Sequence, residues 1–122
     1  MAVIESSAFG YARAPATLGS DVDCNVVWLR GEHDMSTSSA DSEVLACAIA
    51  RNDWNVTVDL SDVWFMDAST IRTLVRARAF LDERSRSLTL RSPSRSAALV
   101  IRVCGLEGLV DVLPIPANGS GR

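Results

Sequence analysis

The sequence of 122 residues contains no lysine, one histidine and three widely spaced cysteines. Cys24, Cys47 and Cys104 form no CxxC pair, and His33 is near none of them in the sequence. A zinc site or a disulfide framework is therefore not expected, because both need a characteristic spacing of cysteine and histidine. We predict three small, partly buried thiols, with neither a metal ion nor a cofactor, and leave open a redox switch between two of the thiols.

Long apolar runs are absent as well. No stretch approaches the roughly 20 residues that a membrane-spanning helix needs. The first twenty residues lack the basic segment and the apolar segment of a secretory signal. With 48% hydrophobic and 22% charged residues, the composition is typical of a soluble globular protein. We expect a cytoplasmic protein with a single core, because a chain of this length is too short for two.

Motifs that would support catalysis are missing. The sequence has no GxSxG, no phosphate-binding P-loop, no GxGxxG and no HExxH. His33 lies in the segment Gly31-Glu32-His33-Asp34 at the end of a predicted strand, and we expect it to be a surface residue rather than a catalytic base. The protein is therefore not expected to be an enzyme.

Charge is unevenly distributed along the chain. Residues 1–67 carry eleven acidic residues and three arginines, a net charge of −8, whereas residues 68–122 carry four acidic residues and nine arginines, a net charge of +5. Such asymmetry can accompany nucleic-acid binding, and Arg72 and Arg76 would share one helix face, as would Arg95 and Arg102. Because no nucleic-acid motif is present and the chain is acidic overall, with a net charge of −3, we expect no direct nucleic-acid contact.

The hydrophobic pattern predicts one α/β domain over residues 21–115. Residues 1–20 are predicted to form a flexible arm with a short edge strand near Phe9–Arg13, and residues 116–122 a flexible tail. Between them, strands alternate with helices, which favours parallel strand pairs joined by right-handed crossovers. The expected elements are strands at Cys24–Arg30, Val56–Leu60, Leu88–Leu90 and Val110–Leu113, and helices at Ser38–Arg51, around Ile71, Leu74, Val75 and Leu81, and at Ser94–Cys104.

The most informative segment joins the central strand to the second helix. The strand is predicted to end near Ser61, and the apolar residues Trp64-Phe65-Met66 to anchor the connection. Asp67 or Ser69 can cap the helix that follows, because its first N–H groups have no partner within the helix. A hydroxyl here can also act as a switch, since phosphorylation adds about two negative charges. Arg72 opposes the helix dipole slightly; it is either solvated, reaching toward Asp67, or a contact to an acidic patch on a partner.

These residues resemble a STAS domain, the fold of bacterial anti-sigma factor antagonists. Gly31-Glu32-His33-Asp34 resembles the family's Gly-Glu-Leu-Asp, and Val58–Ser61 with Phe65-Met66-Asp67 resembles its central strand and the loop before its key helix. Ser92-Pro93-Ser94, opening a helix that runs to Gly105-Leu106, resembles its C-terminal part. The resemblance extends from about Val26 to Leu113. It implies a mixed β-sheet of four to five strands with α-helices packed mainly on one face.

The resemblance also implies a partner and a site. An antagonist of this family binds an anti-sigma factor of the serine kinase type and so releases a sigma factor; phosphorylation at the start of the second long helix ends binding. Neither a membrane nor a nucleic acid is implied as a partner. The implied docking surface consists of Asp34, Met35, Ser36, Thr37, Met66, Asp67, Ala68, Ser69, Thr70 and Arg72.

The sequence departs from the family pattern at the switch itself. The family's phosphorylated residue follows the loop aspartate directly, and here that position is Ala68, which has no hydroxyl. Ser69 comes one residue later, about 100° further around a helix, and either accepts the phosphate or only caps the helix. Thr70-Ile71-Arg72 adds bulk where a partner would approach. The hypothesis is an antagonist that works without the usual phosphorylation; the alternative is a STAS accessory subunit of a transporter or a signalling scaffold.

Overall fold

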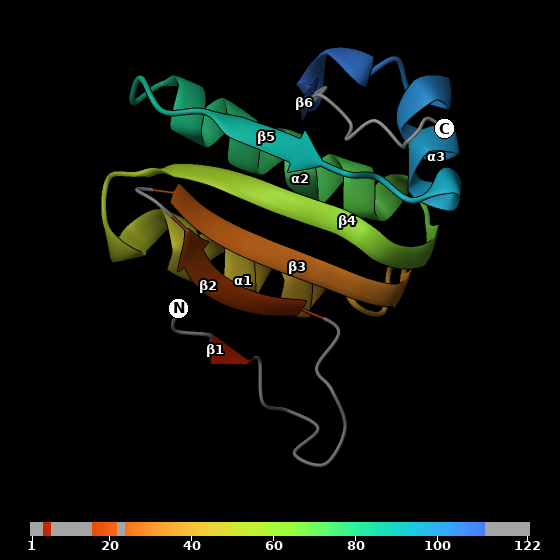
Figure 1. Cartoon of the computed structure of the whole chain (residues 1–122), viewed down its shortest axis with the longest axis horizontal. Coiled ribbons are helices and arrows are strands. Elements are labelled where there is room, and N and C mark those ends of the chain that lie inside the picture. Colours follow the sequence, from red (N-terminus) through yellow and green to blue (C-terminus); the bar gives the residue numbers. More distant parts are fainter. Residues whose placement is uncertain (1–3, 6–15, 22–23, 112–122) are drawn as a thin grey trace.

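A computed structural model describes residues 4–5, 16–21 and 24–111 of the chain (Figure 1). The strands are β1 (Ile4–Glu5), β2 (Ala16–Asp21), β3 (Cys24–His33), β4 (Asn55–Met66), β5 (Leu88–Arg91) and β6 (Val110–Asp111). The helices are α1 (Ser38–Arg51), α2 (Ala68–Asp82) and α3 (Arg95–Val103), with a short 3₁₀ turn η2 at Glu107–Leu109.

All six strands form one mixed sheet in sequential order. The pairs β1–β2 and β2–β3 are antiparallel, whereas β3–β4, β4–β5 and β5–β6 are parallel. Parallel neighbours need a crossover between them, and α1 and α2 supply it for the two central pairs. This confirms the predicted α/β class. Four strands have at least four residues, and β1 and β6 extend the sheet by two residues each.

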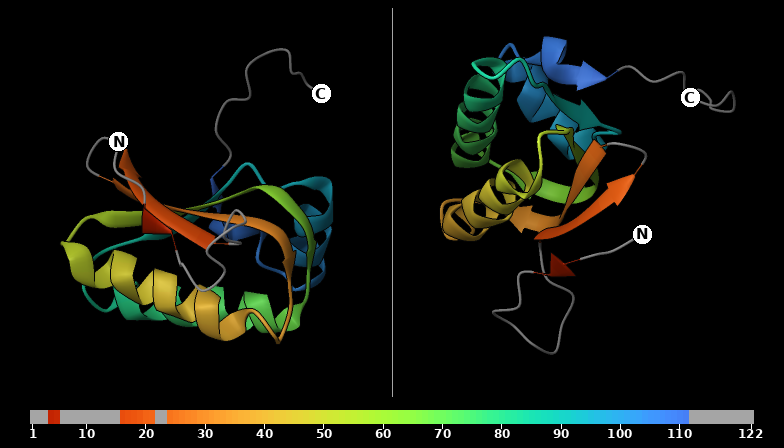
Figure 2. Two further views of the ribbon diagram at one scale, coloured as in Figure 1. Left: turned by 90° about the horizontal axis from the view of Figure 1, so that it is seen from below. Right: turned by 90° about the vertical axis from the view of Figure 1, so that its left-hand side faces the viewer.

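One face of the sheet carries the core. Val56, Val58 and Leu60 alternate along β4 and are fully buried, as expected for side chains that point to the same face at every second residue. The helices α1 and α2 pack side by side against that face (Figure 2). The third helix packs against β4 and contributes Ala97 and Ile101 to the same core. The predicted location of the helices mainly on one face is confirmed.

The ordered domain begins earlier than the predicted Asp21. Residues assigned to a flexible arm form β2, which pairs with β3 along its whole length, from Ala16 opposite Leu29 to Asp21 opposite Cys24. Ala16 and Leu18 are buried in the core. The residues of this segment are small and polar, so the sequence did not predict a strand here. The strand is buried because it pairs with β3. The predicted edge strand at Phe9–Arg13, and the predicted tail at 116–122, lie outside the described residues.

The helix boundaries agree closely with the sequence patterns. The first helix has the predicted bounds, and α3 begins after Pro93 with Ser94 as its cap, whose hydroxyl accepts the Ala97 N–H at 3.1 Å. One prediction for the second helix is wrong: Val75 was placed in its apolar stripe, but the side chain is 38% exposed and does not belong to it. Within the described part of the chain, no helix combines the length and the hydrophobicity needed to cross a bilayer.

Candidate functional site

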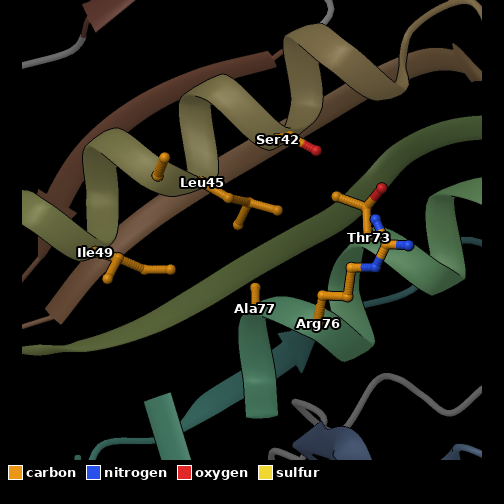
Figure 3. A pocket seen from close by; sticks show the side chains of 7 residues that line it. Ser42, Leu45, Ile49, Thr73, Arg76 and Ala77 are labelled. Carbon is orange, nitrogen blue, oxygen red and sulfur yellow. The ribbon is translucent and has the colours of Figure 1, made fainter. Parts of the chain in front are cut away.

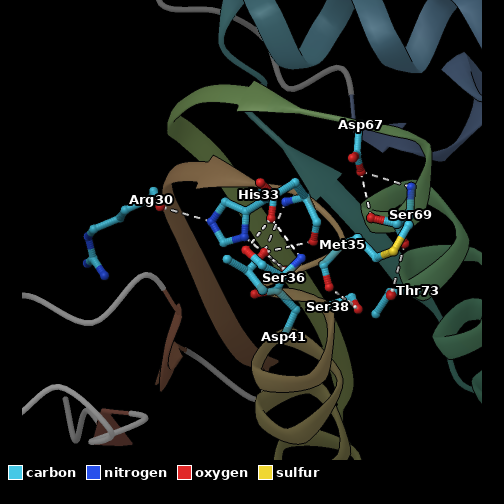
Figure 4. A network of polar contacts seen from close by, with 11 residues as sticks. Arg30, His33, Met35, Ser36, Ser38, Asp41, Asp67, Ser69 and Thr73 are labelled. Carbon is cyan, nitrogen blue, oxygen red and sulfur yellow. Dashed lines mark hydrogen bonds and ion pairs between the residues drawn. The ribbon is translucent and has the colours of Figure 1, made fainter.

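Two connections meet at one edge of the sheet. Because β3 and β4 are parallel, they end side by side, with His33 opposite Met66. The Asp67 N–H donates to the His33 carbonyl at 3.1 Å, so hydrogen bonding between the two segments continues just past the end of β4. The loop at Asp34–Thr37 and the beginning of α2 are thus neighbours (Figure 4). The two segments that the sequence analysis assigned to one docking surface are brought together by the fold.

Asp67 organises the start of α2. Its Oδ1 accepts the Ser69 N–H at 3.0 Å and the Ser69 hydroxyl at 2.6 Å. This satisfies one of the helix N–H groups that lack a partner within the helix. The Thr73 hydroxyl donates to the Ser69 carbonyl at 3.1 Å one turn further on. Ala68, the first helical residue, is exposed, so the tip of the helix faces solvent.

Removal of this cap has a measurable cost. We expect Asp67→Ala to lower the free energy of unfolding by about 1 kcal/mol, the usual effect of losing an N-cap acceptor. Asp67→Asn keeps a side-chain oxygen at the same position and serves as the matched control. Urea unfolding followed by circular dichroism measures both; an equal loss in the two variants would contradict the capping role.

The loop between β3 and α1 is built around Asp34. Its Oδ1 accepts the Ser36 N–H at 2.8 Å and the Ser36 hydroxyl at 2.6 Å, and the Thr37 N–H donates to its carbonyl at 3.1 Å. The two hydrogen bonds that Ser36 donates to the carboxylate, that of its hydroxyl first, lower the pKa of Asp34 below its ordinary value. The turn leaves the side chain of Met35 77% exposed.

The lowered pKa gives a pH prediction. The carboxyl group of Asp34 has a lower pKa in the folded chain than in the unfolded one. The ionised group therefore stabilises the folded chain at neutral pH, and this stabilisation is lost as the pH falls through the folded pKa. Ser36→Ala removes the leading cause, so the pKa of Asp34 is expected to rise toward its ordinary value. Carbon-detected NMR titration of the carboxyl group measures it. Ser39→Ala, at an exposed serine nearby, should leave the titration unchanged.

A buried ion pair supports this loop from below. His33 and Asp41 are 0% and 1% exposed, and Nδ1 of His33 lies 2.9 Å from Oδ2 of Asp41. The other ring nitrogen, Nε2, lies 2.9 Å from the Arg30 carbonyl (Figure 4). A carbonyl only accepts, so Nε2 carries a hydrogen, and one further hydrogen lies between Nδ1 and the Asp41 carboxyl group. The pair fastens the end of β3 to the first turn of α1.

The predicted surface position of His33 is therefore wrong. The strand runs three residues beyond the predicted end at Arg30, and its last residue turns inward beneath α1. Asp41 compensates the cost of burying the polar ring. No enzyme-like arrangement follows from this, because both ring nitrogens of His33 already face acceptors within the fold.

The proposed docking residues divide into two groups by exposure. Met66 and Thr70 are 2% and 0% exposed, so neither can touch a partner, and the bulk expected from Thr70 points into the core. Arg72 is exposed and, among the described residues, forms no ion pair with Asp67 or any other acid. The remaining residues are at least partly accessible; they are Asp34, Met35, Ser36, Thr37, Asp67, Ala68 and Ser69.

Two residues of the site were missed by the sequence analysis. Trp64 and Phe65 were expected to anchor the connection, yet they are 66% and 48% exposed. The strand β4 continues to Met66 with a bulge: Gly31 pairs with Val63 and the next residue, Glu32, with Phe65, so Trp64 has no partner on β3. An extra residue of this kind redirects the side chains near it. Gly31 adopts a φ of +80°, which favours glycine at this irregularity.

The three thiols are free and lie apart from this edge. Cys24 is half-buried, with Sγ 3.1 Å from the Thr57 hydroxyl. Cys47 and Cys104 are exposed, contrary to the prediction of partial burial. Among the described residues, no group of histidine, cysteine and acidic side chains is suited to hold a metal ion.

The sequence matches the model of a known family over most of its length. The family model described as "Mlab, STAS domain" matches residues 16–113. The chain belongs to the STAS domain family. This confirms the resemblance found in the sequence, and the model starts at the same Ala16 at which β2 begins. No curated protein sequence matches this STAS domain.

Solved structures share its fold. The anti-sigma factor antagonist SpoIIAA in its unphosphorylated form has a TM-score of 0.70 at 19% identity, covering 79% of this chain and 85% of the other. The phosphorylated form of SpoIIAA, the Bacillus cell fate determinant, has a TM-score of 0.64 at 19% identity, covering 79% and 88%. SLC26A9 has a TM-score of 0.61 at 10% identity, and the match covers 84% of this chain but only 18% of the SLC26A9 chain.

Proposed function

We propose that this STAS domain is an anti-sigma factor antagonist that binds a kinase-type anti-sigma factor and thereby releases a sigma factor. The observation that carries the proposal is that three large apolar side chains, Met35, Trp64 and Phe65, are exposed on the two segments that meet at this edge, where the first residue of α2 is exposed too. Aromatic and methionine side chains are enriched in protein-binding surfaces. The fold shared with SpoIIAA supports this type of partner.

The arrangement of Ser69 favours an antagonist without the phosphorylation switch. Its hydroxyl donates to Asp67 at 2.6 Å and is part of the helix cap. A phosphate on that oxygen would break the hydrogen bond and place about two negative charges beside a carboxylate. Ala68 occupies the exposed position and offers no acceptor. The site is therefore suited to binding and poorly suited to modification.

Calorimetric titration of the purified chain with candidate anti-sigma kinases tests the binding. We expect one of them to bind in a one-to-one complex and to lose its sigma factor on addition of the STAS domain. Failure of every kinase encoded beside a sigma factor in the host genome to bind would remove the proposal.

Phosphorylation is tested separately, with ATP, the bound kinase and mass spectrometry. The chain as it stands should remain unmodified, whereas Ala68→Ser places a hydroxyl at the exposed first position of α2 and should be phosphorylated there. The double variant Ala68→Ser, Ser69→Ala identifies which residue is modified. Phosphate on Ser69 of the unaltered chain would show that the switch is present one residue later than usual.

The alternative is an accessory module of a larger assembly, such as a transporter or a signalling scaffold. Its support is SLC26A9, in which a segment of this fold makes up less than a fifth of the chain. The titration separates the two proposals, since an accessory module would bind none of the kinases.

A further inference from the structure

A groove runs between the two helices that cover the sheet. Its first part, about 190 Å³, is lined on α1 by residues that include Ser42 and Leu45 and on α2 by Thr73, Arg76 and Ala77 (Figure 3). Its second part, about 440 Å³, continues to Phe80, Arg84 and Arg86. Ala46 and Ile49 line both parts, so the two form one continuous depression.

The floor of the groove is apolar and built largely from small side chains. Ala46, Ala50 and Ala77 leave room along the seam between α1 and α2, and Ile49 fills its middle. Small residues at a helix surface allow another helix to approach closely. From Thr73 to its end at Asp82, α2 borders the groove for roughly 14 Å at 1.5 Å per residue, which is about two and a half turns of a helix laid along it.

The rim of the groove is positively charged. Arg76 lines the first part and Arg84 and Arg86 the second, whereas Arg72 lies one turn before Arg76 on α2 and lines neither part. Arg84 covers the Phe80 ring, with its guanidinium carbon 3.5 Å from the ring centre. Arg86 lies beyond, with its guanidinium group donating to the Trp54 carbonyl.

No acidic side chain lines either part of the groove. Of the rim arginines, Arg84 has only a long contact of 3.9 Å to Glu83. Arg72 and Arg76 make no ion pair with any described residue, and both are exposed. The groove thus presents unpaired positive charge beside an apolar floor, a combination that complements an apolar segment bordered by acids.

We infer that the α1–α2 groove binds an acidic amphipathic helix of a partner protein. The apolar face of that helix lies on Ala46, Ile49 and Ala77, and its acidic residues meet Arg76 and Arg84. Amphipathic helices are recognised in grooves of this kind through apolar anchors at helical spacing. The surface is separate from the exposed group Met35, Trp64 and Phe65, and the inference holds whether or not the partner there is an anti-sigma factor.

A helix-locked synthetic peptide tests the inference directly on the full chain. The probe has about 18 residues, with leucine and alanine on one face, glutamate on both flanks and a hydrocarbon staple on the outer face. Fluorescence anisotropy at low salt measures its binding. We expect saturable binding that is at least about tenfold weaker for a peptide with glutamine in place of glutamate, equivalent to 1.4 kcal/mol.

Two protein variants locate the binding. Arg76→Glu should weaken the acidic peptide about tenfold and weaken the glutamine peptide much less. Arg95→Glu makes the same change of charge on α3, which lines neither part of the groove, and should have little effect. Amide shifts of Ala46, Ile49 and Ala50 on addition of the peptide place it in the groove, and circular dichroism confirms that both variants are folded.

Any of four results would overturn the inference. The first three are no binding of the acidic peptide, equal binding of that peptide to Arg76→Glu and to the unaltered chain, and amide shifts confined to other surfaces. A fourth is displacement of the peptide by a fatty acid that binds more tightly than it does, which would assign the groove to a small anionic amphiphile instead. None of these results depends on whether the chain binds a kinase, so the proposed function is tested independently.

Discussion

Replacement of Asp41 by alanine is expected to lower the free energy of unfolding by about 3–5 kcal/mol. Its carboxylate is 1% exposed and faces the fully buried ring of His33 at 2.9 Å. Without it, the buried Nδ1 loses the carboxyl group that lies 2.9 Å away, and removal of one partner of a buried polar pair is strongly destabilising. Because whole domains are stable by only about 5–15 kcal/mol, this change alone removes a large part of the stability.

Two further variants separate the ion pair from general effects of mutation on α1. Asp41→Asn keeps a side-chain oxygen that can accept a hydrogen bond from Nδ1 of His33. Its free energy of unfolding should therefore fall clearly less than that of Asp41→Ala. Glu43→Ala removes an exposed carboxylate from the same helix and should change stability by less than about 0.5 kcal/mol. Urea unfolding measures all three. Similar losses for Asp41→Ala and Glu43→Ala would show that the pair contributes nothing specific.

The variant Asp41→Asn should also make the loop at Asp34–Thr37 more mobile. The His33–Asp41 pair connects the end of β3 to α1, and Met35 lies in the loop between these two residues. Amide hydrogen exchange at Ser36–Ser38 is therefore expected to speed up moderately in Asp41→Asn, because a neutral amide oxygen accepts a weaker hydrogen bond than a carboxylate does. An unchanged exchange rate would mean that the turn around Asp34 holds its conformation by itself.

Truncation of Trp64 should have the largest effect on partner binding. We expect Trp64→Ala to weaken binding to the anti-sigma factor about 30-fold, corresponding to about 2 kcal/mol, the scale of an aromatic hot spot. The side chain is 66% exposed, so little packing is lost and stability should fall by less than about 1 kcal/mol. Calorimetric titration of the folded variant measures the affinity.

The control for Trp64 is Leu99→Ala. Leu99 is 57% exposed on α3, a helix that contributes none of the proposed docking residues. Its truncation should leave affinity within about twofold of the unaltered chain, since exposed residues outside an interface contribute little. Equal losses in Trp64→Ala and Leu99→Ala would place the partner on a different surface.

Much of the candidate site could be predicted from local sequence. The sequence located the start of α2 at Asp67-Ala68-Ser69 because a carboxylate or hydroxyl before an apolar helical stripe is a cap signal, and the structure shows Asp67 in that role. The loop at Asp34–Thr37 was placed beside it by the resemblance to the STAS family alone, and the parallel pairing of β3 with β4 explains why the two segments meet. Exposure within the site was harder to predict: Met66 and Thr70 proved buried, and Trp64 and Phe65 proved exposed.

The order of strands and helices was therefore determined by the sequence itself, because hydrophobic periodicity and helix caps act over a few residues. The burial of His33, the exposure of Trp64 and the inclusion of Ala16–Ser20 in the sheet were decided only by tertiary structure. Each depends on a residue far away or on the neighbouring strand: the carboxylate of Asp41 across a loop, the register of β3 against a bulged β4, and the pairing of β2 with β3. Such contacts fix which side chains face a partner, and no local pattern contains them.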